Sequence, residues 1–139
     1  MVHALVVLDA SAALAMVLTE EEGQEVAELI GGTISVNGQI FVPGLFWYEL
    51  GNGLLMAERT DRIASGSSSA ALSSFCRLPI VTQQQGDFPI LARIVSLAQE
   101  NDLTYYDASY LELALRYGAP LKSFDAHLNK LKASFPLIL

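Results

Sequence analysis

An α/β fold built on a parallel sheet is the class that this sequence predicts, on three observations. Short apolar runs of strand length alternate along the chain with longer segments that carry apolar residues at helical spacing. The chain has 139 residues, about the size of one domain. Of these residues, 52% are hydrophobic and 17% are charged, which is enough for a substantial core. We therefore expect a single domain, residues 1–139, with a central parallel sheet of about five short strands and helices on both faces.

The expected strands are short and mostly apolar. The first, residues 4–8, is a continuous apolar run that ends on Asp9, which is typical of a strand covered on both faces. The same reading places the other strands at residues 39–42, 78–82, 121–124 and, as a last edge strand, 137–139.

The expected helices fill the intervals between the strands. Ser11 is a candidate cap for a helix over residues 12–18, and the pair Gly31 and Gly32 is expected to close a helix over 20–30. A later helix begins near Asp107 and ends before Gly118. The remaining helices are expected at residues 45–60, 63–77, 88–101 and 126–133.

Charge and composition exclude several classes of partner. The net charge is −7, which argues against general binding to phosphate backbones and against an anionic membrane surface. The apolar N-terminal run carries Asp9, lacks a basic start and is shorter than the ~20 residues of a spanning helix, so no membrane segment is expected. Lys122, Lys130 and Lys132 still form a local basic group that is a candidate for holding RNA phosphates.

The single cysteine, Cys76, excludes an internal disulfide and a cysteine-based zinc site. Its neighbours Phe75 and Leu78 predict a small buried side chain at this position. This cysteine usage fits a reducing compartment, and we expect a cytoplasmic protein.

Four acids are the candidates for chemistry. Asp9 and Asp125 each follow a predicted strand, Asp107 begins a helix, and Glu49 lies inside an apolar helix. Because the carboxyl ends of parallel strands meet at one edge of a sheet, the four carboxylates are expected to form one cluster. A group of carboxylates without histidine favours a hard divalent cation such as Mg²⁺ or Mn²⁺.

A structural explanation stays open for the aspartates. Asp9 and Asp125 precede helices, where aspartate is favoured as a cap, and Thr104 with Asp107 matches a capping box. Glu49 has no such explanation, and a buried unpaired carboxylate is costly, so it must be paired, exposed in a cleft or bound to metal. For Tyr105, Tyr106 and Tyr110, packing around the start of the helix is preferred over a stacking surface for bases.

Four stretches in this order resemble the PIN-domain nucleases, and within them the VapC-type toxins of bacterial toxin–antitoxin pairs. The stretches are LVVLDASAAL with Asp9, WYELGNGL with Glu49 and Asn52, YYDASYLELALRYGAPL with Asp107, and PLKSFDAHL with Asp125. Together they cover essentially the whole chain.

The resemblance implies a Mg²⁺- or Mn²⁺-dependent endoribonuclease in which Asp9, Glu49, Asp107 and Asp125 hold the metal. It also implies supporting positions, which are here Ser11, Asn52 and Ser123. One departure is that the residue after the last aspartate is often basic in the family, whereas this chain has Ala126. The alternative is a non-catalytic acidic α/β module for protein binding, either degenerate PIN-like or receiver-like.

Two kinds of protein partner are expected. The high hydrophobic content predicts a homodimer, because a small core leaves apolar side chains uncovered. The resemblance implies a small antitoxin protein. The helix with Phe46, Trp47 and Leu54 is apolar nearly all round, which predicts a contact surface for that partner.

Overall fold

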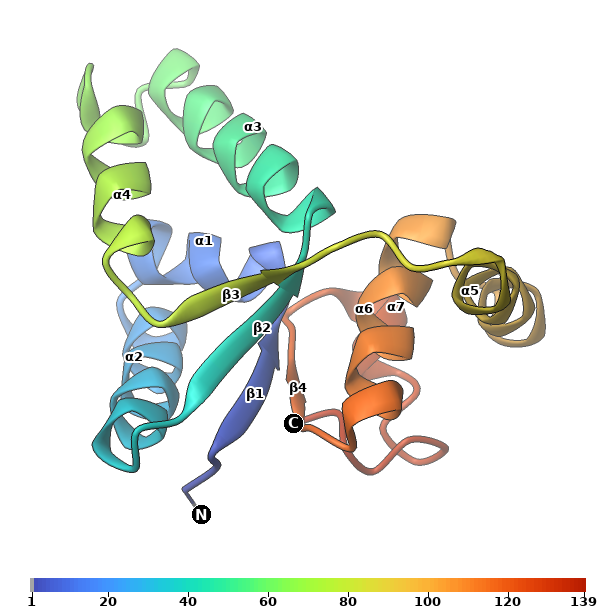
Figure 1. Ribbon diagram of the computed structural model, residues 1–139. Coiled ribbons are helices and arrows are strands. Elements are labelled where there is room, and N and C mark those ends of the chain that lie inside the picture. Colours follow the sequence, from blue (N-terminus) through green and yellow to red (C-terminus); the bar gives the residue numbers. More distant parts are fainter. Residues whose placement is uncertain (1) are drawn as a thin grey trace.

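The computed structural model describes residues 2–139 and contains one parallel sheet. Within these residues the sheet has four strands in the order β3-β2-β1-β4 (Figure 1). The strands are β1 (Leu5–Leu8), β2 (Gln39–Pro43), β3 (Ile80–Gln83) and β4 (Leu121–Lys122). All three pairings are parallel, so the carboxyl ends of the four strands lie at one edge.

Helices cover both faces of this sheet, as the sequence predicts for an α/β fold. Figure 1 shows α1 and α2 on one side of the central strands and α6 and α7 on the other. The pair α3 and α4 packs through α3 on α1, and α5 packs on α6. Their bounds are α1 (Ala10–Leu18), α2 (Glu21–Ser35), α3 (Leu45–Arg59), α4 (Ser67–Cys76), α5 (Phe88–Asn101), α6 (Tyr105–Tyr117) and α7 (Ala126–Asn129).

The core lies between the strands and the helices that cover them. The apolar run at β1 is buried on both faces, because Val6, Val7 and Leu8 are at most 1% exposed. Leu111 of α6 and Leu50 of α3 are fully buried and belong to the same cluster. This packing fixes where α3 and α6 begin relative to the ends of the strands.

The sheet is smaller than predicted. In the described chain, the expected edge strand at residues 137–139 is reduced to a single bridge between Ile138 and Leu121. The strand at 121–124 ends at Lys122, because Ser123 leaves the ladder and its side chain bonds to Asp9, the residue before α1. The count of about five strands is therefore one too high.

Three helix ends differ from the prediction by at least four residues. The helix expected at residues 126–133 ends at Asn129, and the chain continues in turns. α2 continues through Gly31 and Gly32 to Ser35, because the turn that follows the glycines buries Thr33, whose hydroxyl donates to the Leu29 carbonyl. The helix expected at residues 63–77 begins only at Ser67, after Gly66 with a φ of 86°. A left-handed residue at that position cannot continue a helix.

The burial of several side chains also differs from the prediction. Phe46 and Leu54 are fully buried, and the Trp47 indole donates to the Thr82 hydroxyl at 2.8 Å, so these three do not form an open surface. Cys76 is exposed because Phe75 takes the inward position at the end of α4. Within residues 2–139, no helix has the length and apolar character needed to cross a membrane.

Candidate functional site

The candidate site lies at the carboxyl edge of β1 and β4. Asp9 follows β1 directly, and its backbone N–H donates to the Lys122 carbonyl of β4 at 3.0 Å. Asp125 comes three residues after the end of β4, and its negative charge contributes to the raised pKa of Asp9. The two strand ends thus bring together carboxylates that are 116 residues apart in the sequence, from position 9 to position 125.

All four predicted acids line one concavity of about 280 Å³, which we call the acidic hollow. Glu49 reaches it from α3 and Asp107 from the first turn of α6. Ser11 and Asn52 also lie in its lining. Ser123 is outside the lining, and its hydroxyl donates to the carboxylate of Asp9. The lining contains no lysine, arginine or histidine among the described residues: Asp9, Ala10, Ser11, Leu14, Glu49, Asn52, Gly53, Asp107 and Asp125.

Two serines hold the carboxylate of Asp9, which is only 4% exposed. Ser11 and Ser123 both donate their hydroxyl protons to the same oxygen, Oδ2, at 2.7 and 2.6 Å. Each hydroxyl also accepts a backbone N–H, from Phe124 and Asp125 respectively. Because each serine has one proton and gives it to Asp9, their mutual contact of 3.3 Å carries no hydrogen bond. Ser11 therefore orients Asp9 and does not cap α1 through its side chain.

Glu49 is half-buried and is held by Tyr110 of α6. The Tyr110 hydroxyl donates to Glu49 Oε1 at 2.7 Å, and the tyrosine itself is fully buried. Burial, the charge of Asp9 and the bond to Glu49 all raise the pKa of Tyr110, so this hydroxyl stays protonated as a donor. The bond joins α3 to α6 across 61 positions of sequence.

Asp107 and Asp125 also serve as helix caps or cap partners. Thr104 caps α6 by accepting the backbone N–H of Asp107 at 3.1 Å, as the predicted capping motif requires. Asp125 Oδ1 accepts the backbone N–H groups of His127 and Leu128 at the start of α7. Both the structural and the chemical explanation thus apply to Asp125, because a carboxylate that caps with one oxygen keeps the other available.

Burial raises the pKa of three of these acids. For Asp9 the largest cause is burial, opposed by the bonds from Ser123 and Ser11. Burial also raises the pKa of Glu49 and of Asp107, and the negative charges of the other acids raise both further. A hollow in which carboxylates are desolvated and repel one another favours a bound cation.

The donor set fits a hard divalent cation. Carboxylate and hydroxyl oxygens line the acidic hollow, and these are the ligands that Mg²⁺ and Mn²⁺ prefer. Within residues 2–139, no three histidine, cysteine, aspartate or glutamate side chains lie close enough to form a ready-made metal cluster. An open arrangement suits Mg²⁺, which binds through one or two carboxylates and keeps several waters.

The three lysines expected to hold RNA differ in their surroundings. Lys122 is buried, its ammonium pairs with Glu25 Oε1, and it lies 4.7 Å from the centre of the Phe124 ring. This charge is already neutralised inside the fold, so Lys122 is not placed to contact a phosphate. Lys130 and Lys132 are exposed beyond α7.

Two residues of the site were not predicted from sequence. The sequence predicts only core packing for Tyr110. A buried tyrosine needs a hydrogen-bond partner for its hydroxyl, and this requirement is the feature that could have indicated a role in the site. Asn129 donates from Nδ2 to the Ser123 carbonyl at 2.9 Å and so supports the loop that holds Asp9. No local pattern marks Asn129, because its bond depends on how α7 folds back.

Comparison with known families agrees with this geometry. The family described as PIN domain matches residues 6–133, which is most of the chain. The chain belongs to the PIN domain family. The match extends from β1 to beyond α7, so all four acids of the hollow lie inside it.

Individual relatives of this PIN domain chain are ribonucleases by name. The chain is 28% identical over 126 residues to VapC ribonuclease Mb0985 of Mycobacterium bovis and to ribonuclease VapC9 of Mycobacterium tuberculosis. Each alignment covers 90% of this chain and 89% of the relative.

Solved structures show the same PIN fold. PAE2754 from Pyrobaculum aerophilum superposes with a TM-score of 0.67 at 25% identity, over 90% of this chain and 84% of the other. VapC20 of Mycobacterium tuberculosis, named as a toxin that cleaves the sarcin-ricin loop, superposes with a TM-score of 0.60 at 12% identity, over 90% and 93%. The latter likeness shows the fold alone.

Proposed function

We propose that this PIN domain protein is a Mg²⁺- or Mn²⁺-dependent endoribonuclease that acts as the toxin of a toxin–antitoxin pair in the cytoplasm. The observation that carries the proposal is the meeting of Asp9, Glu49, Asp107 and Asp125 around one hollow with no basic side chain in its lining. The relatives named VapC ribonucleases support the same activity.

The four carboxylates would hold the metal, one or two by direct contact and the others through the waters that it keeps. When bound, the cation supplies positive charge that neutralises the acids and polarises the scissile phosphodiester. The hydroxyls of Ser11 and Ser123 keep Asp9 in one orientation, and Tyr110 does the same for Glu49. Asn52 is exposed at the rim of the hollow and offers an amide that can donate to a phosphate oxygen.

Positive charge for the flanking RNA backbone would come from few residues. Lys130 and Lys132 are exposed beyond α7, the helix that Asp125 caps. Each phosphate that they contact adds to affinity and makes it fall as the salt concentration rises.

Cleavage of single-stranded RNA by the purified protein tests the proposal. We expect cleavage with Mn²⁺ or Mg²⁺ and none with excess chelator. Single changes Asp9→Asn, Glu49→Gln, Asp107→Asn and Asp125→Asn are each expected to abolish cleavage while circular dichroism shows an intact fold. Glu100→Gln is the matched control, because this carboxylate is exposed on α5 and lies outside the hollow. Wild-type rates in two of the four variants would refute the assignment.

The partner proposal is a small antitoxin protein that covers the site. Its contact is expected on the exposed side of α3, where Leu55 and Met56 are 39% and 46% exposed. An arginine from the partner suits the paired carboxylates of the hollow best. Co-expression with the neighbouring small reading frame checks this: the two proteins should elute together and RNA cleavage should be inhibited. If the double variant Leu55→Ala and Met56→Ala is inhibited as strongly as the wild type, the exposed side of α3 is not the contact surface.

A further inference from the structure

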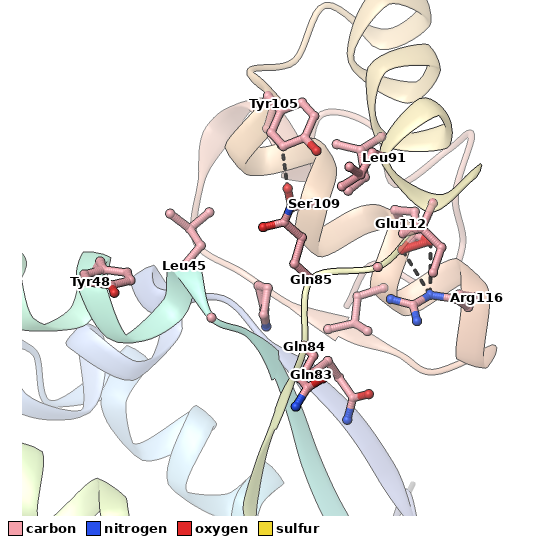
Figure 2. Close-up of a pocket in the computed structure, with 16 residues that line it drawn as sticks. Leu45, Tyr48, Gln83, Gln84, Gln85, Leu91, Tyr105, Ser109, Glu112 and Arg116 are labelled. Atoms are coloured by element: carbon pink, nitrogen blue, oxygen red, sulfur yellow. Dashed lines mark hydrogen bonds and ion pairs between the residues drawn. The ribbon is translucent and has the colours of Figure 1, made fainter. Parts of the chain in front are cut away.

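A second concavity lies along the same edge of the sheet as the acidic hollow. It has a volume of about 340 Å³, within the size range of small-molecule sites. Its walls are the first turn of α3, the linker at residues 83–86, and the facing sides of α5 and α6. Figure 2 shows Tyr48 and Leu45 on one side and Tyr105 and Ser109 on the other, with Gln83, Gln84 and Gln85 along the linker between. We call it the tyrosine cleft, after Tyr48 and Tyr105.

The tyrosine cleft and the acidic hollow are neighbours in the fold. The hollow lies where β1 and β4 end, and the cleft lies where β2 and β3 end, in the strand order β3-β2-β1-β4. Adjacent strands are about 4.8 Å apart, so the two concavities occupy consecutive parts of one edge. The same helix turns serve both: Tyr48 precedes Glu49 on α3, and Tyr105 lies two residues before Asp107 on α6. A strand of RNA placed at the hollow can therefore reach the cleft.

The residues that line the cleft carry no net charge. They combine aliphatic side chains with the faces of two tyrosines and the amides of the linker; the aliphatic ones are Pro43, Leu45, Ile90, Leu91, Ile94 and Leu113. The charged residues of its lining, Glu112 and Arg116, form an ion pair of 3.0 Å, and Glu112 also pairs with Arg93 at 3.5 Å. Tyr48 is 81% exposed. Tyr105 and, outside the cleft, Tyr106 are 42% and 60% exposed, so the expectation that these two tyrosines pack in the core is wrong. The amide groups of Gln84 and Gln85 are exposed on the linker.

Few positive side chains are available to bind the RNA backbone, so a neutral binding site would add affinity. The protein has eight lysines and arginines against fifteen acids. Three of the eight are in ion pairs, Arg93 and Arg116 with Glu112 and Lys122 with Glu25. Contacts to phosphate alone would therefore give weak binding at physiological salt. Stacking on aromatic side chains adds affinity without requiring positive charge.

We propose that the tyrosine cleft binds a nucleobase of single-stranded RNA, next to the phosphodiester that lies at the acidic hollow. Tyr48 and Tyr105 stack on the base, and the amides of Gln84 and Gln85 bond to its polar edge. The inference rests on the proposed ribonuclease function. An apolar protein surface fits less well, because it would bury these glutamine amides without partners, at a cost of roughly 1–3 kcal/mol each.

Binding of a fluorescein-labelled single-stranded RNA, followed by anisotropy, tests the proposal. The parent protein for the measurement is Asp9→Asn, so that the RNA stays intact. Adding Tyr48→Ala or Tyr105→Ala is expected to raise Kd roughly 5- to 150-fold, since stacking contributes about 1–3 kcal/mol per base. Tyr48→Phe keeps the aromatic face and should bind like the parent. Phe88→Ala is the matched control, because Phe88 is an aromatic residue 78% exposed outside the cleft.

An abasic scan of the same RNA identifies the bound nucleotide. One abasic position should weaken binding to the parent as much as Tyr48→Ala does, and should cost nothing further in the Tyr48→Ala protein. Equal affinity of both alanine variants and the parent would overturn the inference, while cleavage by the wild type would still support the ribonuclease proposal. A wild type that neither binds nor cleaves RNA would overturn both.

Light scattering tests whether the cleft binds a second copy of this chain and not a base. If Tyr48→Ala converts a dimer to a monomer and leaves RNA affinity per chain unchanged, the cleft is a protein interface and the base-binding inference is wrong. A variant that keeps the oligomeric state of the parent but loses RNA affinity supports it.

Discussion

The hydrogen bond from Tyr110 to Glu49 allows a sharp test of how the acidic hollow is organised. Tyr110→Phe removes one hydroxyl and keeps the ring, which is fully buried between α6 and its neighbours. Glu49 then loses the only side-chain donor that the described residues give it. Its carboxylate becomes free to rotate away from the hollow, and its pKa rises further because the bond from Tyr110 lowers it.

The structure sets the size of the effect. A hydrogen bond to a charged group contributes about 1.5–3 kcal/mol, and the half-buried position of Glu49 places this bond at the lower end. Because 1.4 kcal/mol is a factor of ten, Tyr110→Phe should weaken Mn²⁺ binding about tenfold. Titration calorimetry with Mn²⁺ measures this without any RNA. The cleavage rate at limiting Mn²⁺ should fall by a similar factor.

Two comparisons show whether the effect passes through Glu49. Tyr117→Phe removes a hydroxyl of the same helix, one that donates to Gln83 at 3.2 Å outside the hollow, and should leave Mn²⁺ affinity unchanged. In a Glu49→Gln protein, the further change Tyr110→Phe should cost much less than tenfold, because the two residues act as a pair. Mn²⁺ affinity equal to wild type in Tyr110→Phe, or a full additional loss in the double variant, would refute the argument.

Three further outcomes are expected. In the metal-free protein, the pKa values of Asp9, Glu49 and Asp107 are raised, so the folded state binds protons more tightly than the unfolded state. The free energy of unfolding should therefore rise as pH falls from 7 toward the usual pKa values of 3.8 and 4.5. Thermal melts that show no change over this pH range would contradict the pKa shifts. Thr104→Ala removes the cap of α6 and should lower the free energy of unfolding by about 1 kcal/mol in urea melts, whereas Thr60→Ala, at the exposed end of α3, serves as the comparison and should cost less. Light scattering at micromolar concentration should show a homodimer, and a monomer would contradict the expected self-association.

The meeting of the four acids could be predicted because it depends on simple geometry. Asp9 and Asp125 follow parallel strands, so the sheet alone brings them to one edge. Glu49 lies in the second turn of α3, which begins where β2 ends, and Asp107 lies in the first turn of α6, which follows α5. Local sequence patterns therefore carry most of the information about this site.

Other features depend on contacts that no local pattern contains. The Tyr110–Glu49 bond requires a particular packing of α6 against α3, and the pairing of Lys122 with Glu25 requires α2 to pass beside β4. The same limit explains the end of α2. Gly31 and Gly32 resemble a helix end, but the buried Thr33 that follows them keeps the chain helical as far as Ser35. Tertiary packing here outweighs the local preference of glycine.

The arrangement of charge connects folding with the proposed activity. Burial and mutual repulsion raise the pKa of three acids in the hollow, so the metal-free site opposes folding at neutral pH. The hydroxyls of Ser11, Ser123 and Tyr110 offset part of this cost by donating to the charged forms of Asp9 and Glu49. Under the proposed function, a cation held by these acids would relieve the remainder and would let the hollow accept the negative charge of a phosphodiester. Because the chain has few positive side chains besides Lys130 and Lys132 to hold the rest of the RNA strand, we expect neutral contacts at the tyrosine cleft to supply much of the remaining affinity.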